Sequence, residues 1–333
     1  MSAAIHFFER DAVDLHPREF MNHTSGYLAL SPAKTRFTVA EIPGLVAYRE
    51  QGKHLVVMGG VHAPPACRAR LLDSFLAEAA TRKRRVIVLQ LHAEQRALFA
   101  SRGFQVNQMG TSFGLRLSDF SLAGTRRMKL RHKIKRANEA GMKVLEVGRE
   151  LPDDDSTYSG IYRISDNWLA HKGRHELAFL IGEIGHSGQT DRRVFVVVDA
   201  NQTMLGFITY VPVWGNYPGY LHDLTRRLPD APPGTMELCN AFAIERFRGE
   251  GIAHLHFGFT PFIVDESSYP GESRLAAFLI KLIGSYGGRL YPAQSQAMYK
   301  NKWAPNIVER EYIAFQKLSL RALLDILFLT RTL

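Results

Sequence analysis

The sequence predicts an α/β (α+β) fold of two domains that repeat one architecture, and three observations support this. The chain has 333 residues and is 46% hydrophobic, which suits two cores of ordinary domain size. Apolar strand patterns alternate with amphipathic helix patterns along its length. From Arg126 onward the order of strands and helices runs through a second time. We therefore predict domains over residues 1–122 and 123–333.

The first domain is predicted to be a mixed sheet with two helices late in the order. The second helix ends at Gly103, a favourable C-cap, and Phe104 leads directly into a strand. Helix, glycine, phenylalanine and strand in this order are typical of the end of a GNAT-type acyltransferase domain. The expected strands cover residues 26–30, 36–41, 45–50, 54–58, 85–91 and a last stretch up to 117, and the expected helices cover 66–82 and 93–102.

The second domain is predicted to begin with a basic helix and to end with a strand. A hairpin turns at Asn201–Gln202, and residues 229–233 are a proline-rich loop between a strand and a helix. Strands are expected at 142–147, at 193–211 as the hairpin, and at 219–223, 254–257 and 307–315; helices are expected at 126–140, 157–170, 235–248, 274–286 and around Tyr299. The predicted fold is therefore two tandem GNAT-like acyltransferase domains.

Charge and cysteine content indicate which partners and which cellular compartment to expect. The net charge of +10 favours polyanions such as RNA, anionic lipid headgroups or phosphorylated cofactors. Cys67 and Cys239 lack neighbours at metal-ligand or redox spacing, so we expect two buried thiols in a reducing compartment. The sequence shows no signal-peptide pattern and no run of about 20 apolar residues. We expect a cytoplasmic protein.

Two segments could hold a phosphate group. Arg246–Gly251 has the spacing of a coenzyme A loop, but it lies at the end of a helix, where the free groups are carbonyls, so we interpret it as a glycine C-cap. The stretch 223–235 stands in the right place, before a helix. Its arginines Arg226 and Arg227 could bind phosphate or carboxylate through two hydrogen bonds each. A solvated loop with an Asp–Arg pair remains the alternative.

The helix that opens the second domain carries seven Lys or Arg in eleven residues and no acid before Glu139. Such a surface suits a phosphate backbone, so we expect RNA or lipid binding rather than an ordinary solvated face. The last segment, 318–333, holds nine Leu, Ile or Phe and is expected to pack on the second domain; lying on a bilayer is the alternative. His254 and His256 are interpreted as structural, with no metal site expected.

Several stretches together resemble a known family. They are Lys129–Gly141, Ser165–Leu169 followed by Glu176–Phe179, Asp223–Asp230, Phe257–Pro261, Glu272–Ala277 and Tyr299–Pro305. In order and spacing they are similar to the aminoacyltransferase domain of bacterial phosphatidylglycerol lysyl- and alanyltransferases, the multiple peptide resistance factor type. The resemblance covers essentially the whole chain and is strongest from residue 126 to 315. The stretch 274–291 departs from the family pattern because it is about one helical turn longer, which loosens the assignment of Glu272.

The resemblance implies a site at the domain junction, with the charged 3′ end of tRNA on one side and the acceptor on the other. It assigns catalytic roles to Asp223, Arg226, Glu272 and Lys302, substrate binding to Arg227, Trp168, Glu176 and Lys300, and tRNA binding to Arg126, Arg127, Lys129, Arg131, Lys133, Lys135 and Arg136. The implied acceptor is a phosphatidylglycerol-like lipid or a small molecule. A peripheral contact with the inner face of the membrane is expected, and DNA is not expected as a partner.

The implied reaction moves an amino acid from tRNA to a hydroxyl or an amine. The ester of a charged tRNA is already activated, so the enzyme has to align the acceptor and stabilise an oxyanion, with aminoacyl-tRNA as co-substrate and no cofactor. We expect Arg226 and Lys302 to hold phosphate or the oxyanion, while Asp223 fixes the arginine or binds the substrate's α-ammonium group. An acyl-coenzyme A N-acyltransferase of the GNAT class, and an inactive RNA-binding module, are the alternatives.

Overall fold

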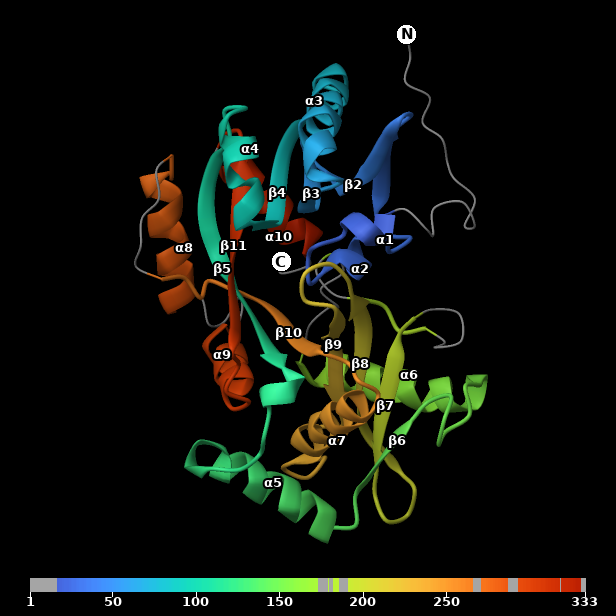
Figure 1. Ribbon diagram of the computed structural model, residues 1–333. Coiled ribbons are helices and arrows are strands. Elements are labelled where there is room, and N and C mark those ends of the chain that lie inside the picture. Colours follow the sequence, from blue (N-terminus) through green and yellow to red (C-terminus); the bar gives the residue numbers. More distant parts are fainter. Residues whose placement is uncertain are drawn as a thin grey trace.

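The strands of the molecule lie side by side in one sheet, in the order β1-β2-β3-β4-β11-β5-β10-β9-β8-β7-β6 (Figure 1). The structure is a computed structural model that describes residues 17–172, 179, 182–185, 191–265, 271–286, 293–317 and 319–330. The strands are β1 (Thr35–Val39), β2 (Ile42–Gln51), β3 (His54–His62), β4 (Arg85–His92), β5 (Gln105–Arg116), β6 (Lys143–Glu146), β7 (Arg193–Val198), β8 (Met204–Val213), β9 (Gly219–Arg227), β10 (His254–Pro261) and β11 (Ile307–Phe315).

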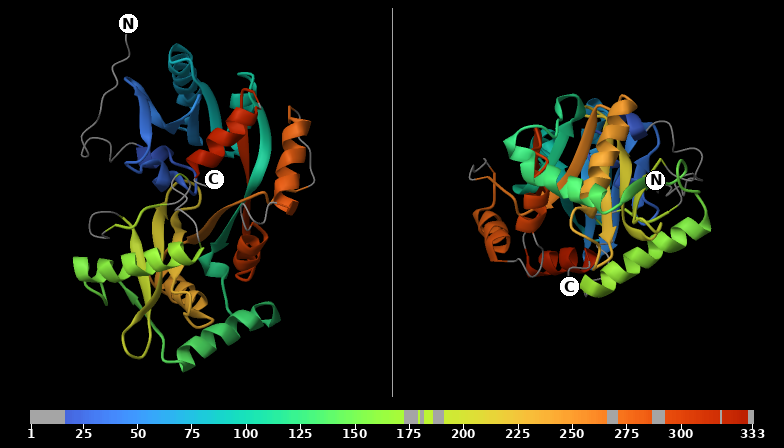
Figure 2. Two further views of the ribbon diagram at one scale, coloured as in Figure 1. Left: turned by 180° about the vertical axis from the view of Figure 1, so that it is seen from behind. Right: turned by 90° about the horizontal axis from the view of Figure 1, so that it is seen from below.

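The described helices cover both faces of this sheet. They are α1 (Pro17–Phe20), α2 (Gly26–Ala29), α3 (Pro65–Thr81), α4 (Arg96–Ala100), α5 (Met128–Glu139), α6 (Asp155–Lys172), α7 (Thr235–Gly249), α8 (Arg274–Tyr286), α9 (Ala293–Asn301) and α10 (Leu320–Leu329). Figure 2 shows α6, α8 and α10 on one side of the sheet and α5 and α7 on the other. Short 3₁₀ turns precede α4 and α5 and follow β5.

Each half of the sheet is built around one parallel strand pair with a helix between its strands. In the first half β3 and β4 are parallel and α3 connects them; in the second half β9 and β10 are parallel and α7 lies between them. All other strand pairs in the described sheet are antiparallel. The predicted repeat of one α/β architecture is therefore confirmed.

The last strand of the chain connects the two halves. β11 is inserted between β4 and β5, and β5 also pairs with β10 of the second half. The sheet therefore continues across residues 122 and 123, where we placed the domain boundary. The boundary remains a prediction, because one continuous sheet runs through both halves.

Several expected elements differ from the structure in their bounds, and one differs in its type. Residues 26–30 were expected to form a strand, but Gly26–Ala29 is the short helix α2, with Leu28 and Ala29 buried. A five-residue apolar run has too few positions to distinguish a strand from a buried helical turn. The strand expected at 219–223 continues to Arg227 because Gly206, Phe207 and Ile208 of β8 pair with its last residues. Arg226 and Arg227 thus belong to a strand and not to a loop.

The two cysteines also differ in their surroundings. Cys239 is fully buried on α7, as expected, whereas Cys67 in the first turn of α3 is only half-buried. Both thiols are free. The expectation of two buried thiols is therefore correct for Cys239 and wrong for Cys67, because the start of α3 lies at the edge of its core.

The C-terminal helix α10 packs on the first half of the sheet, against β2 and β3, and not on the second domain as expected. Asp325 is 1% exposed and fixes this arrangement. Its Oδ2 accepts hydrogen bonds from the backbone N–H of Lys53 at 3.1 Å and from Nδ1 of His54 at 2.7 Å. The groups that bind Asp325 of this apolar helix therefore lie in the β2–β3 turn and at the start of β3. Among the described residues, no helix has both the length and the apolar character needed to cross a membrane.

Replacing Asp325 with Ala should destabilise the protein by about 2–4 kcal/mol, because it leaves a part-buried N–H and a buried imidazole without their acceptor. Urea denaturation measures this change. The matched control is Arg321→Ala, which removes the exposed partner of the same carboxylate, 3.1 Å from Oδ1, and should cost less than about 1 kcal/mol. Equal effects of the two substitutions would contradict the assignment.

Candidate functional site

The Arg246–Gly251 segment ends α7 and does not form a phosphate loop. Gly251 has a φ of +75°, and its N–H bonds to the carbonyl of Arg248 at 3.0 Å. The N–H of Ile252 then bonds to the carbonyl of Phe247 at 2.9 Å. This is the pattern of a glycine-terminated helix. The C-cap interpretation is confirmed.

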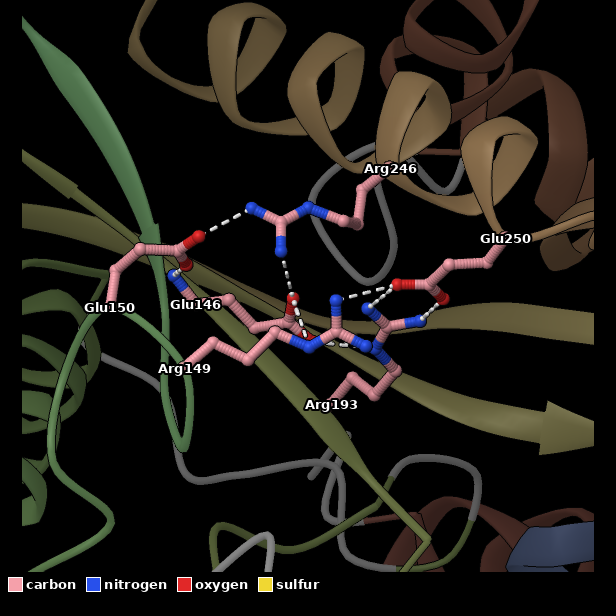
Figure 3. A network of polar contacts seen from close by, with 6 residues as sticks. All are labelled: Glu146, Arg149, Glu150, Arg193, Arg246 and Glu250. Atoms are coloured by element: carbon pink, nitrogen blue, oxygen red, sulfur yellow. Dashed lines mark hydrogen bonds and ion pairs between the residues drawn. The ribbon is translucent and has the colours of Figure 1, made fainter.

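The arginines around this helix end are already paired with glutamates (Figure 3). Arg246 contacts Glu150 at 2.5 Å and Glu146 at 3.3 Å. Arg193 contacts the same Glu146 at 2.6 Å and also pairs with Glu250. Because Glu146 is 3% exposed, this network joins β6, β7 and α7 from within the protein. It is a structural clamp that leaves little positive charge for a phosphate.

The candidate site lies where β9 and β10 separate. These strands, which the structure describes in full, pair only over Gly219–Leu221 and His254–His256. Beyond that point β10 has a bulge at Gly258, with a φ of +68°, and β9 continues to Arg227 paired with β8 alone. In an α/β sheet, ligands bind at the carboxyl ends of such diverging parallel strands. The side chains of β9 therefore form the centre of the site.

One face of β9 presents Asp223 and Arg226. The guanidinium of Arg226 stacks over the ring of Trp168 from α6 at 4.3 Å, and Arg226 is 3% exposed. Asp223 accepts a hydrogen bond from the N–H of Gly182 at 2.9 Å. The structure thus brings together Trp168, Asp223 and Arg226, all of which were predicted as site residues.

The first half of the chain reaches this cluster through Lys34. Its ammonium lies 5.3 Å from the ring centroid of Phe179 and is attracted by the charges of Glu183 and Asp223. Burial lowers the pKa of Lys34 to about 8, and the two carboxylates oppose that shift. Sequence patterns gave no sign of this residue, because Lys34 lies in a loop nearly 190 positions before Asp223.

The opposite face of β9 presents His222, which packs with Tyr210, Phe257 and Tyr299. Its Nε2 bonds with the hydroxyl of Thr225. Burial, and next the charge of Lys300, lower the pKa of His222 to about 3. The ring is therefore neutral at physiological pH.

Beside this face, Glu237 in the first turn of α7 binds two cations. Lys133 of α5 lies 2.8 Å from its Oε1, and Lys302, which follows α9, lies 3.4 Å from the same atom. Burial raises the pKa of Glu237, but the hydrogen bond and charge of Lys133 and the charge of Lys302 outweigh it and lower the pKa. Two ammonium groups around one carboxylate leave a net positive charge, which favours an anion.

The other predicted substrate residues have different positions. Lys300 is buried, and its Nζ donates to the carbonyls of Gly258 at 2.8 Å and Phe259 at 2.9 Å, which fixes the bulge of β10. Burial lowers the pKa of Lys300 to about 7. Arg227 donates to carbonyls of the following loop, among them Ala231 at 3.1 Å. Both cations are thus engaged by backbone.

The structure gives less support to the roles predicted for Glu272 and Glu176. Glu272 is half-buried and lies two residues before α8. The neighbouring Ser273 is fixed to β5, because its backbone exchanges hydrogen bonds with the side chain of Asn107 at 2.9 and 3.2 Å. Glu176 lies outside the described residues. The roles of both remain predictions.

The basic helix uses part of its charge inside the fold. Arg131 donates to the carbonyls of Leu122 and Gly124 at 2.5 Å, and Arg127 donates to that of Trp303 at 3.3 Å. Lys133 is bonded to Glu237, as described above. The predicted tRNA-binding residues that are exposed are Arg126, Lys129, Lys135 and Arg136. These four make up the solvent-facing cationic surface of α5.

The histidines of the described residues support structural roles. His254 and His256 bond to the carbonyls of Pro218 and Tyr217, both at 2.9 Å, as the structural interpretation requires. His23, His92 and Glu311 form a buried group with ligand atoms within 4.8 Å of one another. However, Nδ1 of His23 accepts the N–H of Ser25, so the proton of the neutral ring sits on Nε2, the atom 3.7 Å from Glu311. A protonated Nε2 has no lone pair to offer a metal ion.

A family model described as phosphatidylglycerol lysyltransferase, C-terminal, matches residues 15–315. The chain belongs to this family. The match includes β9, the basic helix and the inserted strand β11, so it covers every part of the site described above. The recognition based on sequence stretches is confirmed.

Individual relatives agree with this membership. The lysylphosphatidylglycerol biosynthesis bifunctional protein LysX of Mycobacterium marinum is 23% identical over 285 residues, which are 84% of this chain and 26% of that protein. LysX of Mycobacterium tuberculosis strain H37Rv is 27% identical over 161 residues, 48% of this chain and 13% of that protein. The chain thus spans about a quarter of the first relative's length.

Solved structures share the fold. L-PGS from Bacillus licheniformis superposes with a TM-score of 0.79 at 19% identity, covering 96% of this chain and 95% of that one. The C-terminal domain of an Agrobacterium fabrum protein described as a lysylphosphatidylglycerol synthetase gives 0.74 at 19% identity, covering 95% and 93%. FemX gives 0.53 at 11% identity, covering 91% of this chain and 97% of FemX. At these identities the comparisons show the fold alone.

Buried histidines should make the stability depend on acid pH. Burial lowers the pKa of His23, His62 and His256 to about 4 and that of His92 and His222 to about 3, from an ordinary value of 6.5. Between about pH 6.5 and 4 the unfolded chain binds more protons, so the free energy of unfolding falls as pH falls, by up to about 1.4 kcal/mol per pH unit for each histidine.

Urea denaturation from pH 7.5 to 4.5 tests this dependence. His256→Gln should reduce the slope by about one proton, whereas His132→Gln on the exposed face of α5 should leave it unchanged. If the two variants have the same slope as the wild type, the buried histidines do not determine acid stability.

Proposed function

We propose that this chain is an aminoacyl-tRNA-dependent aminoacyltransferase that transfers an amino acid to a hydroxyl of a phosphatidylglycerol-type lipid. The family match over residues 15–315 carries the proposal. The Asp223–Arg226 cluster at the separation of β9 and β10 supports it, because it lies where both halves of the chain contribute to one site.

The proposed reaction exchanges one ester for another. The acceptor hydroxyl oxygen attacks the carbonyl carbon of the aminoacyl ester, and a tetrahedral oxyanion forms. The bond from that carbon to the ribose oxygen of the tRNA then breaks, and the proton of the acceptor hydroxyl ends on the ribose oxygen. No electron is transferred, and we propose that no cofactor or metal takes part, with aminoacyl-tRNA as the co-substrate.

We assign the two faces of β9 to two parts of the aminoacylated 3′ end of tRNA. Asp223 is suited to the α-ammonium group of the amino acid, and Arg226, oriented by Trp168, to the oxyanion or a phosphate. On the opposite face, the ammonium groups of Lys133 and Lys302 beside Glu237 are suited to a terminal phosphate. The aminoacyl ester would lie at the point where β9 and β10 cease to pair with each other. In this proposal Arg226 and Lys302 have separate roles, whereas the sequence analysis assigned phosphate or oxyanion binding to both.

The exposed cations of α5 are the proposed tRNA surface. They lie on the helix whose Lys133 contacts Glu237, so RNA bound along α5 would end beside the site. We further propose a cytoplasmic protein that meets its lipid at the inner face of the membrane and has no DNA partner. The net charge of +10 supports both polyanionic partners.

The structure disfavours the acyl-coenzyme A alternative. A GNAT enzyme would need the N-terminus of α7 open for a pyrophosphate group. Here the backbone of α5 covers it: a Cβ at Gly234, the N-cap of α7, would lie 2.4 Å from the carbonyl oxygen of Lys133.

Asp223→Asn and Arg226→Lys should each reduce single-turnover transfer from aminoacyl-tRNA by at least about tenfold, roughly 1.4 kcal/mol in the barrier. Lysine cannot replace the planar guanidinium that stacks on Trp168 and binds through two parallel hydrogen bonds. Rapid-quench measurements of aminoacyl loss from tRNA test this, with the thermal midpoint of each variant as the control for folding. Transfer at the wild-type rate, or loss only in proportion to lost folded protein, would exclude this pair as the site.

Lys129→Glu combined with Arg136→Glu should weaken tRNA binding and flatten its salt dependence, because each lost phosphate contact reduces the slope by about 0.7–0.9. Filter binding between 50 and 300 mM salt measures both quantities. These two cations are exposed and lie outside the structural contacts described for α5. The control is Lys143→Glu, an exposed cation on β6. If this control weakens binding as much, net charge and not α5 determines affinity.

A further inference from the structure

Helix α8 carries an apolar stripe on its solvent side. Leu275 and Phe278 are each 61% exposed, Leu282 is 42% exposed and Tyr286 is 83% exposed. Their spacing of three, four and four residues places them on one face of a helix. A soluble surface usually scatters such side chains singly. This stripe is therefore a feature that needs a partner.

The inner side of α8 is firmly attached to the sheet, so the stripe is presented on a fixed support. Ala276 is 4% exposed and belongs to the core shared with α10. The Asn107 side chain of β5 holds the start of the helix through Ser273. Near its end, Gly284 approaches the carbonyl of Phe262 so closely that a Cβ would lie 2.9 Å from that oxygen.

The charges of α8 indicate what the stripe meets. Arg274 and Lys281 are exposed, lie seven residues apart and therefore flank the stripe on the same side of the helix. No acidic residue occurs between Arg274 and Tyr286. An apolar face bordered by cations, without acids, is the pattern of a helix that lies in the headgroup region of an anionic bilayer.

The position of α8 agrees with such a contact. The helix begins two residues after Glu272, and its support β5 pairs with β10. It lies on the side of the sheet opposite to the basic helix α5 (Figure 2). A bilayer against α8 thus leaves the proposed tRNA surface in water.

We propose that α8 is the membrane-docking surface of this protein, with Leu275, Phe278, Leu282 and Tyr286 inserted among the acyl chains and Arg274 and Lys281 on anionic headgroups. The choice of a lipid partner rests on the proposed function, which needs access to a lipid acceptor. We place the membrane contact on α8 and not on α10, because Ala322, Asp325 and Leu329 of α10 are buried against the first half of the sheet.

Vesicle sedimentation tests the proposal independently of catalysis. Phe278→Ser with Leu282→Ser removes half of the stripe without changing the net charge. This variant should bind vesicles of phosphatidylglycerol and phosphatidylcholine at least about tenfold more weakly than the wild type. The matched control is Met128→Ser with Tyr162→Ser, which removes side chains that are 47% and 46% exposed on α5 and α6. It should bind within about twofold of the wild type.

A second pair of variants separates the two kinds of contact. Arg274→Ser with Lys281→Ser should weaken binding to the anionic vesicles and leave the residual binding to pure phosphatidylcholine unchanged. If Lys129→Glu with Arg136→Glu abolishes vesicle binding while the stripe variant retains it, α5 is the lipid surface and the proposal is wrong. The proposal is also wrong if the wild type is a dimer and the stripe variant is a monomer, because the stripe then packs against a second copy of the chain.

Transfer assays distinguish failure of this proposal from failure of the proposed function. The stripe variant should lose transfer to phosphatidylglycerol in vesicles but retain transfer to a short-chain phosphatidylglycerol dissolved as monomers. Loss of both activities in a folded variant would place the stripe in the site and overturn a docking role. If the wild type transfers to neither acceptor, the proposed function fails, and the vesicle result alone decides the role of α8.

Discussion

The insertion of β11 between β4 and β5 is the constraint on which the rest of the structure depends. β5 pairs with β11 along nearly its whole length and with β10 over its second part. The two halves are therefore connected by continuous backbone hydrogen bonds and not by a polar interface that could slide. This fixes the position of β10, and with it the point at which β10 leaves β9. A site between two halves needs such rigidity, because small displacements of aligned groups cost large factors in rate.

The same insertion explains why charged groups are buried at the centre of the sheet. Glu311 of β11 is 0% exposed, and it accepts the hydroxyl of Ser112 from β5. Lys300 lies near enough for the two charges to interact, while its Nζ is bonded to carbonyls of β10. Burial, the largest effect, raises the pKa of Glu311. Burying these groups costs free energy unless they are bonded, and their bonds connect β5, β10 and β11. They secure the junction and not a solvated surface.

Much of the fold could be predicted because its signals are local. The period-two strands, the glycine that ends α7 and the basic helix α5 are each visible within about fifteen residues. The helix α2 could not be predicted, since the apolar run at Gly26–Leu30 fits a strand equally well. The place of β11 could not be predicted either, because strand order depends on partners about two hundred residues away. Repeated element order showed two halves but not the one sheet that they share.

The candidate site divides in the same way. Asp223 and Arg226 could be found because a strand followed by a proline-rich loop marks the edge of a sheet. Trp168 could be placed beside them only by the family resemblance. Lys34 and Glu237 could not be found, because what makes them notable is a partner from another segment.

Cations are especially hard to interpret from sequence. Lys300 and Lys302 are two residues apart, yet the first is bonded to buried carbonyls and the second lies beside Glu237 at the surface. The basic helix shows the same division, since Arg131 holds its own N-terminal turn while Lys129 faces solvent.

The distribution of charge and apolar surface over the two faces follows from the sheet. α5 packs through Leu130 and Ala137 on the core of α7, whereas α8 packs through Ala276 on the core of α10. A phosphate backbone and a bilayer surface repel each other, because both are polyanionic. The transfer that we propose brings an amino acid from one to the other, so the two surfaces have to lie apart while the reactive groups meet. The proposed site lies between the two surfaces in the chain's architecture, at the point where the backbone pairing of β9 with β10 ends after Leu221 and His256.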